Sequence, residues 1–266
     1  MSITVEHQRT KECDARQQES GGTASVVRAL QLLDVFMGDQ PVLGVSEIGR
    51  RAGIPTSTVH RLLSHLVKGG FVAKDGSNYR LSGKLFELGN QVAHSRPMGL
   101  RDLAAPFLGE LFGATRLTTH LAVLDGPQVV LVDKVVGLST HPARTVVGGR
   151  YPAVCTSLGK AMLAFASEDA VQAVIAAGMP RRTRFTLTHP SALLQELAQI
   201  RNTRLAYDRE EATLGQTCIA APILRNGAAI GAISFSGATN SYDLANHGAT
   251  LVRVTTQLAR QLGRRG

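Results

Sequence analysis

Apolar residues recur with helical spacing in the segment "IPTSTVHRLLSHLVKGGFV", which runs from Ile54 to Val72. Val59, Leu62, Leu63 and Leu66 form one stripe of the kind that an α-helix buries against a core. The opposite side has hydroxyl, imidazole and cationic groups and no acid: Ser57, His60, Arg61, Ser64, His65 and Lys68. Surface helices commonly carry both charge signs. This face therefore indicates either a negatively charged partner or a solvated surface that lacks acids by chance.

The segments around this helix favour the first alternative. Before it, "TASVVRALQLLDVFM" predicts a helix, and "GVSEIGRRAGIP" predicts a shorter helix that Gly53 ends and Pro55 separates from the next. After it, "FVAKDGSNYRLS" predicts a β-hairpin that turns at Asp75-Gly76. A short helix, a glycine-containing turn, an amphipathic helix and a hairpin in this order predict a winged helix-turn-helix.

In such a unit the last helix enters the DNA major groove and places its first side chains on base edges. Hydroxyl groups can bond several bases, and arginine can bind guanine with two hydrogen bonds. We therefore expect DNA contacts from the start of the helix and from the hairpin, or wing. The base-contacting candidates are Thr56, Ser57, Thr58, His60 and Arg61, and the phosphate-contacting candidates are Lys74 and Arg80.

The rest of the chain has a different pattern. "SGKLFELGNQVAHS" predicts a linker helix, and "MGLRDLAAPFLGELFGAT" predicts a second helix that Pro106 bends or divides. Beyond it, hairpins turning at Asp125-Gly126 and Asn226-Gly227 alternate with helices, which predicts an α+β domain on an antiparallel sheet. We expect a disordered tail at 1–23, a winged helix-turn-helix at 24–84, a linker helix at 85–97 and the α+β domain at 98–266.

Charge permits DNA binding without locating it. The chain carries a net charge of +9, but residues 24–94 hold only 8 basic and 5 acidic groups, against 18 and 11 in residues 95–266. The three cysteines are far apart and form no C-x-x-C pair, so we expect neither a disulfide framework nor a zinc site. No signal peptide and no apolar run long enough to cross a membrane is present. These features predict a cytoplasmic protein without a metal or cofactor.

Three segments of the second half converge on a small polar pocket. "VCTSLGKAMLA" contains Gly159-Lys160 but has Val154 and Ala161 where a phosphate-binding P-loop needs Gly and Ser or Thr, so only a capped helix start remains. "YDREEATLGQTCIAAPI" supplies Asp208 and Cys218 on either side of a loop. In "AISFSG", Ser234 and Ser236 share one face of a strand.

An enzyme would need more than these groups. A cysteine nucleophile with a histidine and Asp208 is conceivable, but no local nucleophile signature such as G-x-S-x-G occurs. Free cysteines usually behave as small buried apolar residues. We therefore expect a binding protein and not an enzyme.

The ordered motifs resemble the IclR family of bacterial transcriptional regulators over nearly the whole chain. The resemblance rests on "SVVRALQLLDVF", "VSEIGRRAGIPTSTVHRLLSHL", "NYRLSGKLFELG", "RYPAVCTSLGKAMLA", "YDREEATLGQTCIAAPI" and "AISFSG". It implies a repressor or activator with a GAF-like effector-binding domain. It also implies homodimers, often paired into homotetramers, and a small organic acid as effector. The effector contacts it implies are Ser157, Leu158, Gly159, Asp208, Cys218, Ser234 and Ser236.

Two questions stay open at this stage. Arg204 stands where the family usually has Gly or Ala, so the local turn differs, and the side chain is a possible cation near the pocket mouth. Lys160 either serves the pocket or points to solvent. The alternative function is a small-molecule sensor that acts through a protein partner and uses its N-terminal domain for dimerisation.

Overall fold

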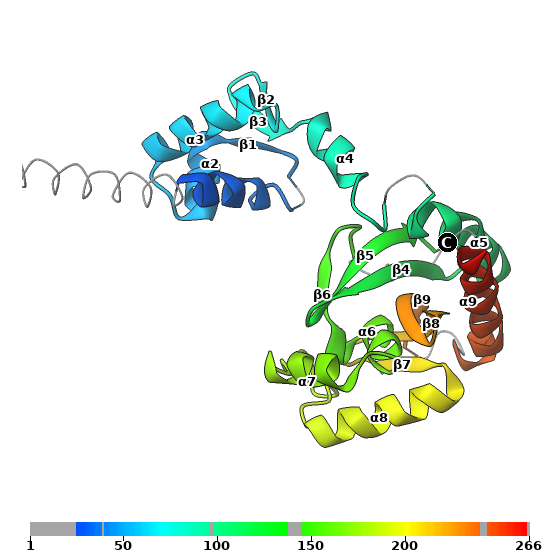
Figure 1. Ribbon diagram of the computed structural model, residues 1–266. Helices are drawn as coiled ribbons and strands as arrows, with labels where there is room; N and C mark the ends of the chain where they lie inside the picture. The colour runs from blue at the N-terminus through cyan, green and yellow to red at the C-terminus, as the bar shows by residue number, and fades with distance from the viewer. Residues whose placement is uncertain (1–24, 39, 96–97, 138–144, 240–243, 265–266) are drawn as a thin grey trace, which may run out of the picture. The chain divides into compact units, whose positions relative to one another are not determined.

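A computed structural model describes residues 25–38, 40–95, 98–137, 145–239 and 244–264 (Figure 1). The expected tail at 1–23 and Cys13 lie outside these residues. The chain divides into two compact units, residues 1–91 and residues 92–266, and each is described by itself. 

The first unit is a winged helix-turn-helix, as the sequence predicts. A helix over residues 25–34 is followed by β1 (Val42–Gly44), α2 (Val45–Ala52), α3 (Thr56–Lys68), β2 (Val72–Asp75), β3 (Asn78–Leu81) and α4 (Gly83–Gly89). The three strands form an antiparallel sheet in the order β1-β3-β2. Strand β1 was not predicted because its three residues are too few to show a period.

Local chemistry explains how α2 and α3 meet. Gly53 ends α2 in the left-handed conformation at φ 66°, which glycine adopts without strain, and Pro55 is the N-cap of α3. The predicted stripe of α3 is buried completely, together with Leu32, Phe36 and Ile48. Gly53, Pro55 and the buried stripe of α3 therefore account for the turn between α2 and α3.

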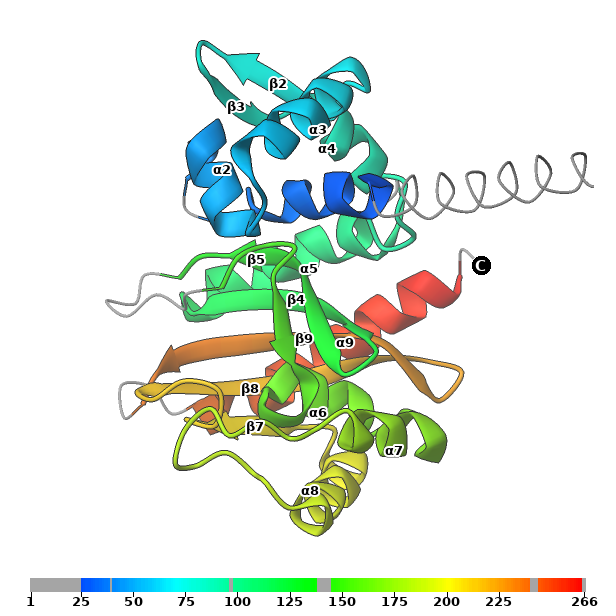
Figure 2. The same cartoon turned by 90° about the vertical axis from the view of Figure 1, so that its left-hand side faces the viewer.

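The second unit is built on a six-stranded antiparallel sheet in the order β6-β5-β4-β9-β8-β7 (Figure 2). In chain order the strands are β4 (Thr118–Asp125), β5 (Gln128–Val135), β6 (Arg150–Pro152), β7 (Ala206–Arg209), β8 (Gln216–Arg225) and β9 (Ala228–Ala238). The α+β class and both predicted hairpins are confirmed. The short strands β6 and β7 were not predicted.

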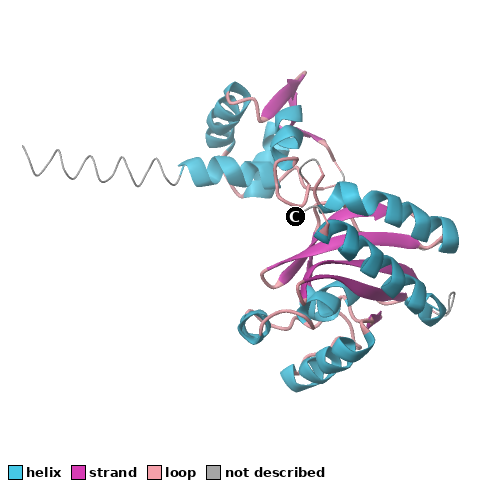
Figure 3. Cartoon of the chain, turned by 45° about the vertical axis from the view of Figure 1, so that its right-hand side comes forward, coloured by secondary structure: helices cyan, strands magenta, loops and turns pink. Residues whose placement is uncertain are grey.

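Helices cover both faces of this sheet. On one face, α5 (Leu100–Thr115) and α9 (Gly248–Gly263) pack on apolar residues such as Leu121, Ile219 and Phe235 (Figure 3). On the other, α6 (Ser157–Leu163) packs against the sheet, with α7 (Glu168–Ala176) and α8 (Pro190–Thr203) in the same core. Two short 3-10 helices are also present. The first, η1 (Ala153–Cys155), precedes α6, and the second, η2 (Leu244–His247), precedes α9.

Two helix predictions need correction. The predicted linker helix ends early, because α4 stops at Gly89 and Val92 is not helical. Leu88 there is exposed, so no apolar contact extends the helix past its glycine. In α5, Pro106 lies inside one continuous helix that it does not divide.

Gly159 has a packing role at the start of α6. A Cβ atom on it would lie 2.2 Å from the carbonyl oxygen of Ala153, closer than any real contact permits. Only glycine therefore lets α6 approach the 3-10 turn before it.

We predict that Gly159→Ala destabilises the second unit by at least about 2–3 kcal/mol, because the backbone must move to admit one methyl group. Denaturant unfolding measures this change. Gly109→Ala is the matched control: it lies in α5 with open space around a new Cβ, and it should be stabilising by about 0.5–1 kcal/mol. Equal stability of the two variants would contradict the packing role.

Candidate functional site

The exposed face of α3 carries the predicted base-contacting residues. Thr56, Ser57, His60 and Arg61 are exposed and Thr58 is half-buried. The N-cap Pro55 has no side chain that could cap the helix, and the first turn contains no acid. The start of α3 therefore presents hydroxyl groups, an imidazole and a guanidinium beside the positive end of the helix dipole, an arrangement suited to a polyanion.

One carboxylate pairs with both arginines of α2, whereas none among the described residues pairs with the basic residues of α3. Both Arg50 and Arg51 donate to Glu47 at 2.5–2.8 Å, and these bonds lower the pKa of Glu47 to about 2. Among the described residues, no carboxylate pairs with Arg61 or Lys68. The positive charge of the unit is thus left available on α3.

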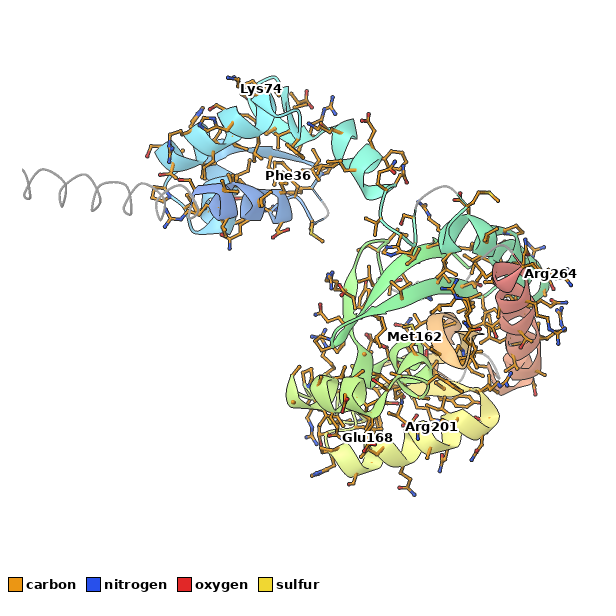
Figure 4. The ribbon with its side chains drawn as sticks, in the orientation of Figure 1. Phe36, Lys74, Met162, Glu168, Arg201 and Arg264 are labelled. Atoms are coloured by element: carbon orange, nitrogen blue, oxygen red, sulfur yellow. The ribbon has the colours of Figure 1, made fainter. Side chains whose placement is uncertain are left out.

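The two wing cations lie on different faces of the hairpin. Lys74 pairs across the ladder with buried Tyr79, whereas Arg80 pairs with Ala73 on the other face. Both are exposed, but Lys74 adjoins the Asp75-Gly76 turn at the tip (Figure 4), while Arg80 is on the central strand of the sheet. The sequence placed them together as flanks of one turn, and the register separates them.

The second unit contains a cavity of about 730 Å³ on the α6 face of the sheet. Apolar walls come from Val129, Leu131, Tyr151, Leu158 and Leu214, and polar groups converge from β4, β7, β8, β9 and the loop before α8. This size and mixture are typical of a small-molecule site.

Strand register explains the convergence. Asp208 pairs with Cys218, Cys218 with Ser236, and Ser236 with Thr118, which forms one row across four strands. Two residues along, Ser234 pairs with His120 in a second row on the same face. Residues from distant parts of the chain thus become neighbours.

Five of the seven predicted pocket residues line this cavity: Ser157, Leu158, Asp208, Cys218 and Ser234. Gly159 does not line it and serves packing, as described above. Ser236 lies behind the lining, where its Oγ accepts a hydrogen bond from Nε2 of Gln216 at 3.0 Å. Gln216 itself lines the cavity, so Ser236 positions a lining group.

The sequence analysis missed His120, which lies at the cavity wall. Its Nε2 is 2.9 Å from Thr145 Oγ1, and its Nδ1 is 3.4 Å from Ser234 Oγ. Burial and the nearby Lys134 ammonium lower its pKa to about 3, so the imidazole is neutral at physiological pH. A neutral ring has one N–H donor and one acceptor nitrogen, so it donates to one of these hydroxyl groups and accepts from the other.

Arg182 and Gln216 also line the cavity without having been predicted. The segment "TTHLAVLD" has three consecutive polar residues followed by four apolar ones, so it lacks the alternation that would have identified the face of His120. No local signal identified Arg182, which lies in a loop that only the tertiary structure brings to the cavity.

The Asp208 side chain is buried, and it both lines the cavity and holds the loop that follows β7. Its Oδ1 accepts hydrogen bonds from the backbone N–H groups of Glu211 (2.7 Å) and Ala212 (3.3 Å), which fixes the loop that continues to Gln216. Burial and the charge of Glu211 raise its pKa to about 7. The carboxyl group therefore changes charge near neutral pH.

Lys160 does not point to solvent. Its side chain is fully buried in α6, and its Nζ donates to Glu196 at 2.7 Å and to Glu211 at 2.5 Å. Burial raises the pKa of Glu211, while the Lys160 ammonium opposes that shift. Lys160 thus joins α6 to α8 and to the loop that Asp208 holds, which is a structural function.

The thiols of the second unit are not activated. Desolvation and the charge of Asp208 raise the pKa of Cys155 to about 11 and that of Cys218 well above its ordinary value. A nucleophilic cysteine needs the opposite shift. Arg204 does not line this cavity, so the hypothesis of a cation at its mouth is wrong for that residue.

Within the described part of the chain, no group of three or more His, Cys, Asp or Glu side chains is placed to hold a metal ion. Among the described helices, none is long and apolar enough to cross a membrane.

Solved structures of similar proteins have counterparts of both units of this chain. An IclR homolog from Microbacterium hydrocarbonoxydans, crystallised with 4-hydroxybenzoate, has a TM-score of 0.77 at 27% identity and covers 89% of this chain and 96% of its own. The IclR of Thermotoga maritima has a TM-score of 0.75 at 28% identity, with coverage of 91% and 99%.

Curated relatives and family models agree with these structures. The HTH-type transcriptional regulator XynR of Escherichia coli is 35% identical over 246 residues, or 90% of this chain and 97% of its own. The transcriptional repressor IclR of Escherichia coli is 32% identical over 226 residues, with coverage of 82% and 81%.

The family models for the IclR helix-turn-helix domain and for the bacterial transcriptional regulator IclR C-terminal domain match residues 25–76 and 92–264. These relatives are transcriptional regulators and not enzymes. The chain therefore belongs to the IclR family of DNA-binding bacterial transcriptional regulators, with a C-terminal effector-binding domain.

Proposed function

We propose that this regulator binds its operator through α3 and that a small organic acid in the cavity of the second unit controls operator affinity. The observation that carries the proposal is the cavity, where a guanidinium, a neutral histidine-serine pair and an ionisable aspartate share one apolar enclosure. We expect the protein to act as a homodimer or homotetramer, as the family resemblance implies.

The distribution of polar groups supports an acid that also carries a hydroxyl or keto oxygen. Arg182 can form two hydrogen bonds with a carboxylate, whereas Ser234 with His120 offers a neutral donor or acceptor. Apolar walls such as Leu131 and Tyr151 suit a carbon skeleton or an aromatic ring. The relative solved with 4-hydroxybenzoate binds a compound of this class, and carbon or aromatic catabolism is the source we infer here.

Operator binding and effector binding are thermodynamically linked in this proposal. An effector that changes DNA affinity by some factor must have its own affinity changed by DNA by the same factor. The alternative, a sensor acting through a protein partner, predicts no salt-dependent binding to a specific DNA sequence. Sequencing the genomic DNA that the purified protein retains distinguishes the two functions.

Arg61→Ala tests the reading of bases by α3. We expect a loss of about 1–3 kcal/mol on the operator with relaxed sequence preference, because a side chain on a base edge is removed. Lys74→Gln at the wing tip is the contrasting variant: it should weaken all DNA alike and lower the salt slope by about one. Fluorescence anisotropy over a range of salt measures both, and unchanged operator binding by Arg61→Ala would refute the assignment.

Ser234→Ala tests the neutral end of the cavity. We expect it to weaken effector binding about tenfold, the effect of one lost hydrogen bond, while the ligand-free protein binds its operator normally. Titration calorimetry with a panel of hydroxylated and keto organic acids gives the affinities.

The matched control is Ser236→Ala, which removes the same hydroxyl from the same strand face but behind Gln216. It should have the smaller effect. If both variants bind the effector as tightly as the parent does, the effector lies elsewhere.

Asp208→Asn tests the pH dependence. Asp208 is neutral below its pKa of about 7 and charged above it, so we expect affinity for an anionic effector to fall as pH rises through 7. His120 remains neutral over this range. Calorimetry at pH 6, 7 and 8 should show a decline in the parent and a flatter profile in the variant.

The raised pKa of Asp208 also makes the free energy of unfolding depend on pH. Because the folded-state pKa lies above the unfolded value, the native state binds more protons between about pH 4 and pH 7, so stability falls as pH rises through that window. Asp208→Asn removes this contribution and should unfold at a higher temperature than the parent at pH 8. A parent and variant with parallel pH profiles would contradict the titration of Asp208.

A further inference from the structure

A second cavity, of about 370 Å³, lies in the same unit between the β8–β9 turn and α9. Three arginines line it: Arg204 after the end of α8, Arg225 at the end of β8 and Arg260 on α9. We call it the arginine cleft. Its floor contains small or apolar residues such as Thr256, Ala259 and Gly263, so the guanidinium groups dominate its chemistry.

No carboxylate of the described residues balances the charge of the arginine cleft. No Asp or Glu lines it, and within the described part of the chain none of its three arginines has a carboxylate partner. Elsewhere in the unit, Arg101, Arg150 and Arg253 each pair with an acid. Arg116 and Arg182 have no carboxylate partner among the described residues either, but the arginine cleft is where three such arginines line one site. A concave site that gathers three unpaired cations attracts anions more strongly than scattered surface charge does.

Backbone geometry places these side chains. Arg204 is the C-cap of α8 in the left-handed conformation at φ 58°, where the chain turns toward β7. Arg225 precedes Asn226-Gly227, the tight turn of the β8–β9 hairpin, and the Asn226 side chain adds a neutral polar group to the lining. The left-handed conformation alone does not bring an arginine to the cleft, because Arg116 has the same conformation at the end of α5 and does not line it.

We propose that the arginine cleft is a second ligand site, which binds the phosphate groups of a phosphorylated small molecule. A guanidinium presents a planar fork of donors that matches phosphate oxygens, and a phosphoryl group carries up to two charges where a carboxylate carries one. Three forks around one cleft therefore fit a ligand with more than one negative charge. A cleft of about 370 Å³ has room for a small phosphorylated molecule, whereas the backbone of a duplex needs an extended surface that it can follow.

This site is independent of the effector cavity. None of the residues that line the arginine cleft lines the larger cavity. A ligand here would let the regulator respond to a phosphorylated metabolite in addition to an organic acid.

Titration of the full-length protein with pyrophosphate at constant ionic strength tests the proposal. Isothermal calorimetry and phosphorus NMR line broadening should show saturable binding of one pyrophosphate per chain, with inorganic phosphate at least tenfold weaker. Arg204→Gly and Arg260→Gln should each weaken binding about tenfold or more.

Two controls separate the cleft from general charge effects. Arg116→Gly removes the same charge at the same backbone conformation away from the cleft, and Arg182→Gln removes the cation of the larger cavity. Both should bind pyrophosphate as the parent does. Unsaturable binding, an equal loss in all four variants, or a loss in Arg182→Gln alone would overturn the proposal.

A titration with random duplex DNA tests whether the arginine cleft binds nucleic acid instead of a phosphorylated small molecule. If the cleft variants lose affinity for DNA while the parent fails to bind pyrophosphate, the cleft contacts nucleic acid and the proposal is wrong. If pyrophosphate binds and the cleft variants retain DNA affinity, the proposal holds.

Discussion

The buried ammonium of Lys160 is the interaction on which the second unit depends. A lone charge in a protein interior is costly, and removing one partner of a buried pair is commonly far more destabilising than breaking an exposed one. Lys160 meets this cost with Glu196 from α8 and Glu211 from the loop after β7. Backbone N–H groups of that loop in turn bond Asp208, so one ammonium fixes the far wall of the cavity. Its two partners lie 36 and 51 residues away in sequence, which is why no local pattern revealed them.

One face of the six-stranded sheet packs in an apolar core, and the other face also lines the cavity. The α5–α9 face is filled by large apolar side chains such as Leu121, Ile233 and Phe235. The α6 face has alanines such as Ala206 and Ala220 in the register positions that α6 covers, and polar residues two positions along the same strands. Because a strand alternates its faces, Ser234 can line a cavity while its neighbours Ile233 and Phe235 hold the core. The strand part of the cavity wall therefore shares its backbone with the core of the opposite face.

Particular elements show what the sequence could and could not predict. The stripe of α3 and the hairpin at Asn226-Gly227 carry complete local signals, and both are confirmed. The end of α4 and the strands β6 and β7 depend on contacts that form only after folding. The same reason separates Ser234, found from alternation within one strand, from His120 and Arg182, which need register and loop placement across the chain.

Charge pairing, more than total charge, indicates where this protein can meet anions. Its positive excess lies mostly in residues 95–266, yet several arginines there are paired with acids. An exposed pair contributes little stability, but it does remove a cation from the field that a ligand meets. What remains unpaired among the described residues includes Arg61 on α3, beside the positive end of a helix, and the three arginines of the cleft. In the wing, the exposed cations Lys74 and Arg80 likewise have no carboxylate partner among the described residues, although the register places them on opposite faces of the hairpin. The proposed sites on α3 and in the arginine cleft therefore share the absence of a pairing carboxylate, and a composition count alone could not have located them.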